Sequence, residues 1–369
     1  MKVSKFDVYE LSLRTIEPFV TAFGAVVDRP LLILRAESVE GVVAWGEGSA
    51  LADPVYMPDT SSSVLDLLAR FFLPTAVGKS YFTIEDVFEE CRQIRGNSAA
   101  RAAFESVMLD LLAREKSISL TRLIGGQERD VECGISLGIY PSVEDLMTAA
   151  EASLHVGFRR LKLKVRPGWD LEPVKAVRAA FPKVPIMIDA NASYDRDSAA
   201  ALIALDGQDL LMIEQPFGVD DLVEHAWLAA RCRTPICLDE SAASLGQVRA
   251  AVALGAVGVV NMKLSRVGGF GQALTIAAFC SDHEIKLWCG GVFESAIGQA
   301  DGLALASLAS FSLPADIGPS ERYFLRDVAQ DLPCMVRGIM RTPIGVGRGI
   351  TVDEEFVSKW GSYRFGVEA

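Results

Sequence analysis

The chain has 369 residues, of which 50% are hydrophobic and 23% charged, a composition typical of a globular protein with two domains or with one large barrel and an attachment. Its 36 Lys and Arg residues against 48 Asp and Glu residues give a net charge of −12, which disfavours nucleic acid and an anionic membrane surface as partners. The longest apolar run, 250–262, is too short to span a bilayer, and residues 1–10 contain no signal-peptide core, so we expect neither a membrane protein nor a secreted one.

The first part of the chain, residues 1–125, is expected to form a separate α+β domain. Short apolar or alternating runs indicate a small antiparallel meander at 5–13, 31–36 and 41–48. Longer helical patterns follow at 61–72, 84–94 and 99–115. The intervening segment Thr15–Asp28 is rich in Gly, Pro, Thr and aromatic residues, and we expect a mobile surface loop there.

From residue 126 to about 318, short apolar runs rich in Ile, Val and Leu alternate with helical stretches. The runs are 131–137, 160–165, 184–189, 210–214, 235–239, 257–263 and 285–289, with a weaker eighth that ends near Asp316. Continuous apolar strands are typical of a parallel sheet that helices cover on both faces. We therefore predict an α/β fold, a (β/α)7β TIM-like barrel with an N-terminal α+β capping domain, and expect the tail 319–369 to return to the cap.

Charged residues end five successive strands of the predicted barrel, each one βα unit after the last. They are Lys164, Asp189, Glu214, Asp239 and Lys263. A single Asp at a strand end is more often a helix N-cap than a catalytic group. Capping does not place lysines there, however, and active sites of such barrels lie at this end. The five residues are therefore our candidate active site.

The three acidic residues of this set favour a metal site. Carboxylates on neighbouring strands repel one another unless a cation neutralises them. Oxygen ligands without His or Cys favour Mg²⁺ or Mn²⁺. Zinc is disfavoured, because the three histidines of the chain (His155, His225 and His283) end none of the predicted strands.

The lysines favour proton transfer. Lys164 ends the second strand and Lys263 the sixth, which places them opposite each other in an eight-stranded barrel, and Lys162 shares the inward face of Lys164. Like charges nearby are expected to lower the lysine pKa values, as a general base requires. The alternative is that the lysines only form ion pairs with the carboxylates. Two lysines beside a metal suggest removal of a proton alpha to a carboxylate, with the metal stabilising the enediolate charge.

At these residues the sequence resembles the enolase superfamily, muconate-lactonising subgroup, in the order Lys-x-Lys, Asp, Glu, Asp, Lys along the barrel. The similar segments span almost the whole chain: 46–48, 54–56, the helix with Ala103, Glu105 and Asp110, and then 159–164, 189–191, 213–216, 237–241, 288–291 and 314–316. The set is similar to the branch of o-succinylbenzoate synthases and N-succinylamino acid (N-acylamino acid) racemases.

This resemblance implies a role for each candidate. Asp189, Glu214 and Asp239 would bind Mg²⁺, for which Mn²⁺ or another divalent cation can substitute. Lys164 would remove the alpha proton. Lys263 would be the second base in racemisation, or a charge stabiliser in the syn dehydration of menaquinone biosynthesis. Lys162 would tune Lys164, and Asn191 and Glu240 would support the ligands from outside.

The resemblance also implies the substrate pocket. Thr15–Asp28 resembles a mobile specificity loop that closes over the substrate. The implied pocket residues are Phe19, Phe23, Tyr56, Ser136, Arg266, Gly291, Val292, Phe293 and Glu294. Val292 and Phe293 depart from the Met and Leu or Glu of the family and are expected to reshape the pocket. Asp316-Ile317-Gly318 lacks the second Asp of a dipeptide epimerase.

Other functions stay open at this point. They are another activity of the subgroup, such as a cycloisomerase or a dipeptide epimerase, a Schiff-base aldolase that uses Lys263, and a non-catalytic barrel. The expected partners are a small-molecule carboxylate and further copies of the chain, as a dimer or octamer. Seven Cys without a CxxC pair indicate free thiols in a reducing cytoplasm.

Overall fold

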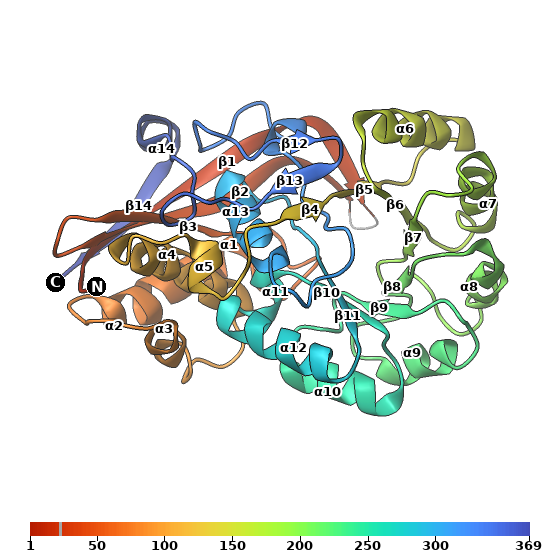
Figure 1. Cartoon of the computed structure of the whole chain (residues 1–369), viewed down its shortest axis with the longest axis horizontal. Helices are drawn as coiled ribbons and strands as arrows, with labels where there is room; N and C mark the ends of the chain where they lie inside the picture. Colours follow the sequence, from red (N-terminus) through yellow and green to blue (C-terminus); the bar gives the residue numbers. More distant parts are fainter. Residues whose placement is uncertain (22–23) are drawn as a thin grey trace.

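The computed structural model describes residues 1–21 and 24–369, and for residues 19–21 and 24–26 it describes the backbone alone. The N-terminal part is built on an antiparallel sheet (Figure 1) with the strand order β14-β1-β2-β3. Its strands are β1 (Val3–Thr21), β2 (Gly24–Ser38), β3 (Val43–Gly48) and β14 (Ser362–Glu368). The three strands predicted from the sequence are thus present, and a fourth comes from the end of the chain.

In its described residues the segment predicted as a loop, Thr15–Asp28, is extended and belongs to β1 and β2, whose ladder is interrupted between Arg14 and Phe19, where Thr15 bridges Phe324 instead. Arg14 pairs with Asp28, and beyond a register shift Thr21 pairs with Gly24. The expectation of a loop is therefore wrong for 15–21 and 24–28, because antiparallel pairing satisfies backbone groups that a loop would leave to water. Phe23 lies outside the described residues, and so does the side chain of Phe19.

Helices cover one face of this sheet. They are α1 (Ser61–Leu67), the π-helical turn η1 (Leu68–Phe72), α2 (Leu73–Ala76), α3 (Ile84–Glu90), α4 (Ser98–Glu115) and α5 (Leu120–Leu123). Capping boxes at Thr60 and Thr83 start α1 and α3. Helix α4 lies so close to β3 that a Cβ on Gly46 would stand 2.5 Å from the backbone nitrogen of Val107. Only glycine permits this approach.

The second part is a parallel sheet of seven strands with helical crossovers. The strands are β5 (Gly134–Leu137), β6 (Arg160–Lys164), β7 (Ile186–Asp189), β8 (Ile213–Glu214), β9 (Ile236–Leu238), β10 (Val259–Met262) and β11 (Lys286–Cys289). The eighth run forms no full strand. It nevertheless closes the ring, because Gly134 N donates to Ala315 O (2.7 Å) on one side and Asp316 N donates to Cys289 O (2.8 Å) on the other. The predicted barrel is confirmed.

The run predicted at 131–137 is split in two. Its first part, β4 (Asp130–Glu132), leaves the barrel and pairs antiparallel with β13 (Ile339–Arg341), which pairs in turn with β12 (Met335–Val336). Only the second part, β5, enters the barrel sheet. The single continuous strand expected there is therefore wrong, since residues far along the chain supply the partner of β4.

Helices lie around the outside of the ring of strands, as Figure 1 shows for α6 to α10. They are α6 (Val143–Val156), α7 (Leu171–Ala180), α8 (Ala200–Ala204), η2 (Asp206–Gln208), α9 (Leu222–Ala229), α10 (Leu245–Leu254), α11 (Leu264–Val267), α12 (Phe270–Asp282) and α13 (Ala296–Ala306). Parallel neighbours require such crossovers. No helix in the described ranges is both long and apolar enough to cross a membrane.

The tail crosses from the barrel back to the N-terminal sheet. It contains η3 (Ser320–Arg322), β12, β13, α14 (Glu354–Trp360) and β14, which pairs antiparallel with β1 from Lys5 with Glu368 onwards. The two ends of the chain consequently lie side by side (Figure 1). The fully buried Arg348 fastens this tail between the two parts. Its guanidinium donates to Asp301 of α13 (2.6 Å), to Trp45 O of β3 (2.5 Å) and to Ser106 O of α4 (2.8 Å).

We expect Arg348→Met to destabilise the protein by about 3–5 kcal/mol, because it leaves Asp301 buried without its cationic partner. The measurement is the free energy of unfolding in urea. Arg341→Met is the control, since Arg341 forms only an exposed pair with Asp130. Equal stability losses for the two variants would contradict the structural role of Arg348.

A buried acid at the contact of cap and barrel makes stability depend on pH. Glu105 of α4 accepts a hydrogen bond from Gly271 N (2.9 Å) at the start of α12, and burial raises the pKa of its carboxyl from 4.5 to about 8. An acid whose pKa is raised on folding binds its proton more tightly in the native state. The free energy of unfolding therefore falls as the pH rises from about 4.5 to about 8.

Glu105→Gln keeps an amide oxygen for Gly271 N but cannot ionise. We expect the variant to lose roughly 3 kcal/mol less stability than the wild type between pH 5 and pH 8. Urea unfolding at the two pH values measures this difference. Parallel pH profiles for the two proteins would show that Glu105 does not ionise in this range.

Candidate active site

The five charged strand-end residues lie at the same end of the barrel. In the sheet register Lys164 of β6 stands beside Asp189 of β7, which stands beside Glu214 of β8. Asp239 and Lys263 directly follow β9 and β10. All five are buried or nearly so. The sequence prediction that they share one rim is confirmed by this register.

Asp189 is held by lysines. Lys164 Nζ lies 2.7 Å from Asp189 Oδ2 and also donates to Asn191 Oδ1 at 2.5 Å, while Lys162 Nζ lies 3.4 Å from the same carboxylate oxygen. Burial alone would raise the pKa of Asp189, but Lys164 and Lys162 hold it well below its usual range. Asp189 is therefore ionised. Asn191, in turn, donates to Glu240 Oε1 at 3.2 Å.

Glu214 is buried between the other two acids. Asn261 Nδ2 donates to its Oε1 at 2.7 Å. Its Oε2 is buried and accepts no hydrogen bond from any described residue, although Lys162 Nζ approaches to 3.4 Å. Burial and the charge of Asp189 raise the pKa of Glu214 to about 7. One acceptor in the middle of the rim is thus left without a hydrogen-bond donor.

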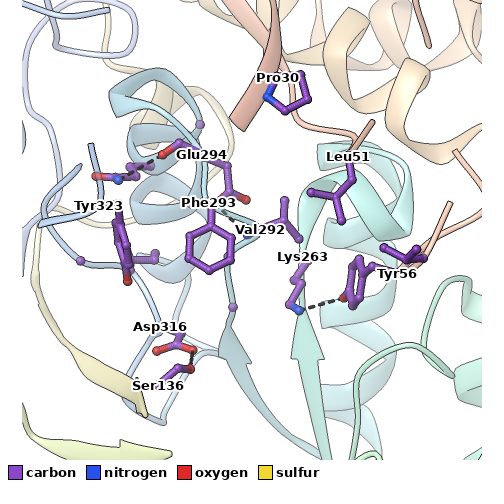
Figure 2. Close-up of a pocket in the computed structure, with 18 of the residues that line it drawn as sticks. Pro30, Leu51, Tyr56, Ser136, Lys263, Val292, Phe293, Glu294, Asp316 and Tyr323 are labelled. Atoms are coloured by element: carbon purple, nitrogen blue, oxygen red, sulfur yellow. Dashed lines mark hydrogen bonds between the residues drawn. The ribbon is translucent and has the colours of Figure 1, made fainter. Parts of the chain in front are cut away.

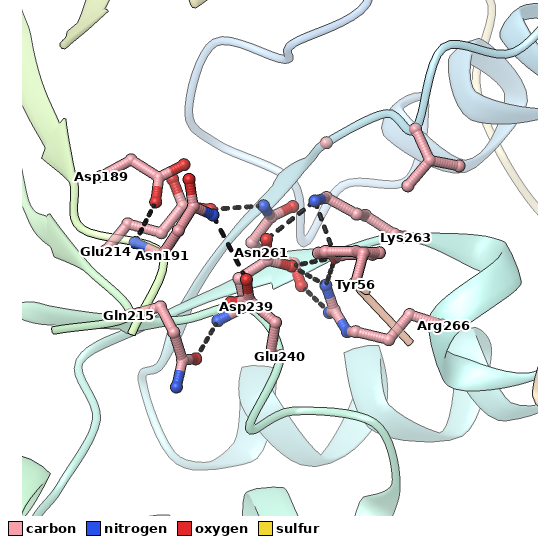
Figure 3. A network of polar contacts seen from close by, with 12 residues as sticks. Tyr56, Asp189, Asn191, Glu214, Gln215, Asp239, Glu240, Asn261, Lys263 and Arg266 are labelled. Atoms are coloured by element: carbon pink, nitrogen blue, oxygen red, sulfur yellow. Dashed lines mark hydrogen bonds and ion pairs between the residues drawn. The ribbon is translucent and has the colours of Figure 1, made fainter. Parts of the chain in front are cut away.

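Asp239 is surrounded by donors (Figure 3). Its carboxylate accepts hydrogen bonds from Lys263 Nζ at 2.7 Å, from Tyr56 OH at 2.8 Å and from the guanidinium of Arg266. Burial would raise the pKa of Asp239, but Lys263 and Arg266 lower it. Tyr56 OH also accepts from Lys263 Nζ at 2.8 Å, so the cap reaches into this network through one phenol.

The expectation of lowered lysine pKa values is wrong for this arrangement. Burial favours the neutral amine of Lys263, but Asp239 outweighs it and raises the pKa of Lys263. Asp316 and Glu214 likewise raise the pKa of Lys162. The sequence argument counted the neighbouring cations, whereas the structure places carboxylate oxygens within 2.7–3.4 Å of the amines of Lys162 and Lys263.

The carboxylates suit a divalent cation in type, and they approach one another without forming a closed ligand group. Asp189 and Glu214 are neighbours in the sheet register, and Lys162 Nζ lies 3.4 Å from a carboxylate oxygen of each. Within residues 1–21 and 24–369, no three His, Cys, Asp or Glu side chains come together as metal ligands. Asp189 and Asp239 instead turn towards Lys164 and Lys263. The acceptor of Glu214 without a donor fits a cation, and binding one requires the other two carboxylates to exchange their lysine partners for it.

A cavity of about 470 Å³ opens above this rim (Figure 2). The lysines Lys162, Lys164 and Lys263 reach it from the barrel side, and Asn191 lines it beside them. Six predicted pocket residues line it as well, namely Tyr56, Ser136, Gly291, Val292, Phe293 and Glu294. Of the predicted pocket residues with described side chains, only Arg266 is outside the lining, because it is buried behind Asp239 and Tyr56.

The structure adds site residues that the sequence argument missed. Asp316 Oδ2 accepts from Ser136 at 2.5 Å and lies 3.0 Å from Lys162 Nζ, so this acid forms part of the cavity floor. Tyr323 packs edge-on against Phe293, with ring centroids 5.4 Å apart. Asn261 stands two residues before Lys263, and the period of two along a strand could have identified it. Tyr323 lies in the irregular tail, where no periodic signal marks it.

Gln215 is a further missed residue, and it fixes the neighbouring strand end. Its Oε1 accepts from the backbone nitrogens of Asp239 and Ser241, both at 3.1 Å, and its Nε2 donates to Ser241 Oγ at 2.7 Å. The residue has a left-handed backbone with φ of 38°. Such a conformation is uncommon without a supporting network. The direction of the Asp239 side chain therefore depends on this amide.

Comparison with known proteins places these features in one family. Residues 6–125 match the mandelate racemase / muconate lactonizing enzyme N-terminal domain, and residues 145–356 match the enolase C-terminal domain-like family.

Individual relatives match over nearly the whole chain. It is 36% identical to an o-succinylbenzoate synthase of Bacillus subtilis (98% of this chain, 97% of the relative) and 39% identical to an N-succinylamino acid racemase of Thermus thermophilus (97% and 96%). A solved enolase-superfamily structure from Listeria innocua superposes with a TM-score of 0.96 at 35% identity, covering 100% and 99% of the two chains.

Proposed function

The chain belongs to the mandelate racemase / muconate lactonizing enzyme family of the enolase superfamily, and on that premise we propose that it removes the proton alpha to a carboxylate of N-succinylamino acids and of the precursor of o-succinylbenzoate. The observation that carries the proposal is the pair of lysines, Lys164 and Lys263, which reach one cavity from strands on opposite sides of three carboxylates. An aldolase would need one lysine and would have no use for the acids between them.

The two lysines divide the proton transfer. Lys164 removes the alpha proton from one face of the substrate, and Asn191 Oδ1 orients its ammonium group afterwards. In racemisation Lys263 delivers a proton to the other face, and Tyr56 OH orients it. In dehydration Lys263 stays protonated and stabilises the negative charge, while the ammonium group of Lys164 returns the abstracted proton to the hydroxyl on the same face, which leaves as water as the double bond forms. Lys162 stays cationic, because Asp316 and Glu214 raise its pKa, and adds a fixed positive charge below the substrate.

Family membership implies a divalent metal, and we propose Mg²⁺ with Asp189, Glu214 and Asp239 as its ligands. Mn²⁺ or another divalent cation is expected to replace it. The bound ion would supply Lewis-acid stabilisation of the substrate carboxylate. Asn191 and Glu240 would support the ligands from outside, as would Asn261, which already holds Glu214 Oε1.

The cavity walls indicate which groups the substrate carries besides its reacting carboxylate. Ser136 and Asp316 offer polar contacts at the floor, whereas Val292, Phe293 and Tyr323 offer an apolar wall for a hydrophobic side chain or a ring. Both reactions share the first proton removal, so one site serves both.

We further propose that the dehydration belongs to menaquinone biosynthesis and that the protein is a homo-oligomer. We also propose a cytoplasmic location, because the seven cysteines of the chain are free thiols.

The test is proton NMR in D₂O with Mg²⁺ and one enantiomer of N-succinylphenylalanine, followed in parallel by polarimetry. We expect loss of the alpha-proton signal together with loss of optical rotation. Dehydration is assayed separately by the ultraviolet absorbance of o-succinylbenzoate. An enzyme that exchanges no alpha proton and forms no o-succinylbenzoate would contradict the proposal.

A further inference from the structure

Arg29, at the cap side of the cavity, has a guanidinium that is fully buried, and among the described residues it donates to backbone carbonyls. It stands in β2 between two cavity-lining residues, Asp28 and Pro30. No Asp or Glu of the described chain forms an ion pair with it. Burial lowers the pKa of Arg29 in spite of the charges of Glu47 and Glu294, and a buried cation without an ion-pair contact is costly unless its donors are satisfied.

The donors of Arg29 join two chain segments that are far apart in sequence. Nη2 donates to Ser49 O at 2.5 Å and Nη1 to Ala50 O at 2.7 Å, directly before the cavity segment Leu51–Tyr56. Nε donates to Val292 O at 3.1 Å and to Phe293 O at 3.2 Å. A single planar group thus holds the cap segment that carries Tyr56 against the barrel loop that carries Phe293.

The barrel loop needs this support because its backbone is strained. Phe293 has φ of 61°, a left-handed value that costs free energy for a residue with a side chain. Glu294 Oε2 holds the loop from the other side by accepting from Val292 N at 2.8 Å. Between the two contacts the ring of Phe293 points into the cavity and against Tyr323, as Figure 2 shows.

We propose that Arg29 is a positioning residue that sets the side-chain selectivity of the enzyme by holding the segments 49–56 and 291–294 at a fixed separation. The inference rests on the proposed function, since it names a determinant of selectivity at that site. Lysine cannot replace this arginine, because its single nitrogen has three donors and cannot span carbonyls on both segments. Without the guanidinium, the carbonyl oxygens of Ser49 and Ala50 lose the donor group that they share with those of Val292 and Phe293, and the wall with Phe293 moves away from the cap.

The first arm of the test is a selectivity ratio. We compare kcat/KM for racemisation of N-succinylphenylalanine and N-succinylalanine in the wild type, Arg29→Lys and Arg348→Lys. Arg348 is the matched control, since its guanidinium is equally buried and also donates to carbonyls, but its carbonyl partners Trp45 and Ser106 do not line the cavity, whereas Val292 and Phe293 do. We expect the ratio to change at least about tenfold in Arg29→Lys and to stay constant in Arg348→Lys.

A second comparison, made in the Phe293→Ala variant, separates an effect through the position of Phe293 from a general loss of activity. In Phe293→Ala the wall residue is absent, so adding Arg29→Lys is expected to change the ratio less than twofold further. A tenfold change that persists in the Phe293→Ala background would overturn the inference, as would an unchanged ratio in Arg29→Lys.

The last arm needs no substrate. Hydrogen exchange followed by mass spectrometry is expected to increase at least about fivefold in peptides covering 49–56 and 290–295 of Arg29→Lys, and not in peptides from α7 or α10. In Arg348→Lys these two segments are expected to stay protected. If the wild type racemises neither compound, the proposed function fails, and exchange alone decides whether Arg29 holds the two segments. A uniform rise over the whole chain would overturn the inference.

Discussion

Replacing Lys164 by Ala is expected to lower both racemisation and dehydration by about 10²–10⁴-fold or more, because the alpha proton then has no base on that face. Replacing Lys263 by Ala is expected to abolish racemisation equally, while the enantiomer whose proton faces Lys164 still exchanges that proton with D₂O. This asymmetry follows from the separate partners of the two amines, Asn191 for Lys164 and Tyr56 for Lys263.

Single-turnover exchange with each enantiomer, followed by NMR, measures this asymmetry. Lys286→Ala is the control, since Lys286 begins β11 at the opposite end of the barrel and is exposed. If Lys263→Ala lost exchange of both enantiomers equally while it remained folded, the division into two one-sided bases would be wrong. Equal rates for Lys164→Ala and the wild type would exclude Lys164 as a base.

Replacing Glu214 by Gln is expected to weaken Mg²⁺ binding by more than about 100-fold, which is the upper range for residues that only support ligands. Glu214 is the central ligand of the proposed set, and its Oε2 is the acceptor without a donor. Isothermal titration calorimetry measures the affinity, and Glu172→Gln, an exposed acid of α7, is the control.

The raised pKa of Glu214, about 7, gives the same experiment a second readout. A cation binds the carboxylate only after its proton has left, so binding at pH 6 releases a proton that binding at pH 9 does not. Titrations in buffers of different ionisation enthalpy measure this release. Affinity and proton release that are identical in Glu214→Gln and the wild type would remove Glu214 from the metal site.

The rim of the barrel could be predicted from the sequence because one geometric rule generates it. Parallel strands put their carboxyl ends at one edge of the barrel. A charged residue at the end of an apolar run, such as Asp189 or Lys263, therefore lies at that edge. Burial on both faces made the runs visible as apolar stretches. Two residues of the wall, Val292 and Phe293, were identified through the resemblance and line the cavity.

The rest depended on contacts between distant segments. Arg29 directly follows a stretch that has the composition of a surface loop, and its buried contacts with the carbonyls of 49–50 and 292–293 join segments far apart in the sequence. The direction of the lysine pKa shifts likewise depends on which charge is nearer, a matter of ångströms that strand order cannot supply. The eighth strand gave only a weak apolar pattern in the sequence. In the structure it is correspondingly short, with few backbone hydrogen bonds such as that from Asp316 N to Cys289 O.

The pairing of β14 with β1 has a consequence for how the protein is made. Lys5 leaves the ribosome long before its partner Glu368, because 368 − 5 = 363 residues separate them in the sequence. At about 5–20 residues per second, this stretch takes roughly 20–70 s to make, and for that time the outer edge of β1 lacks the strand that pairs with it in the folded protein. We therefore expect β1 to need protection from edge-to-edge pairing until β14 has been made.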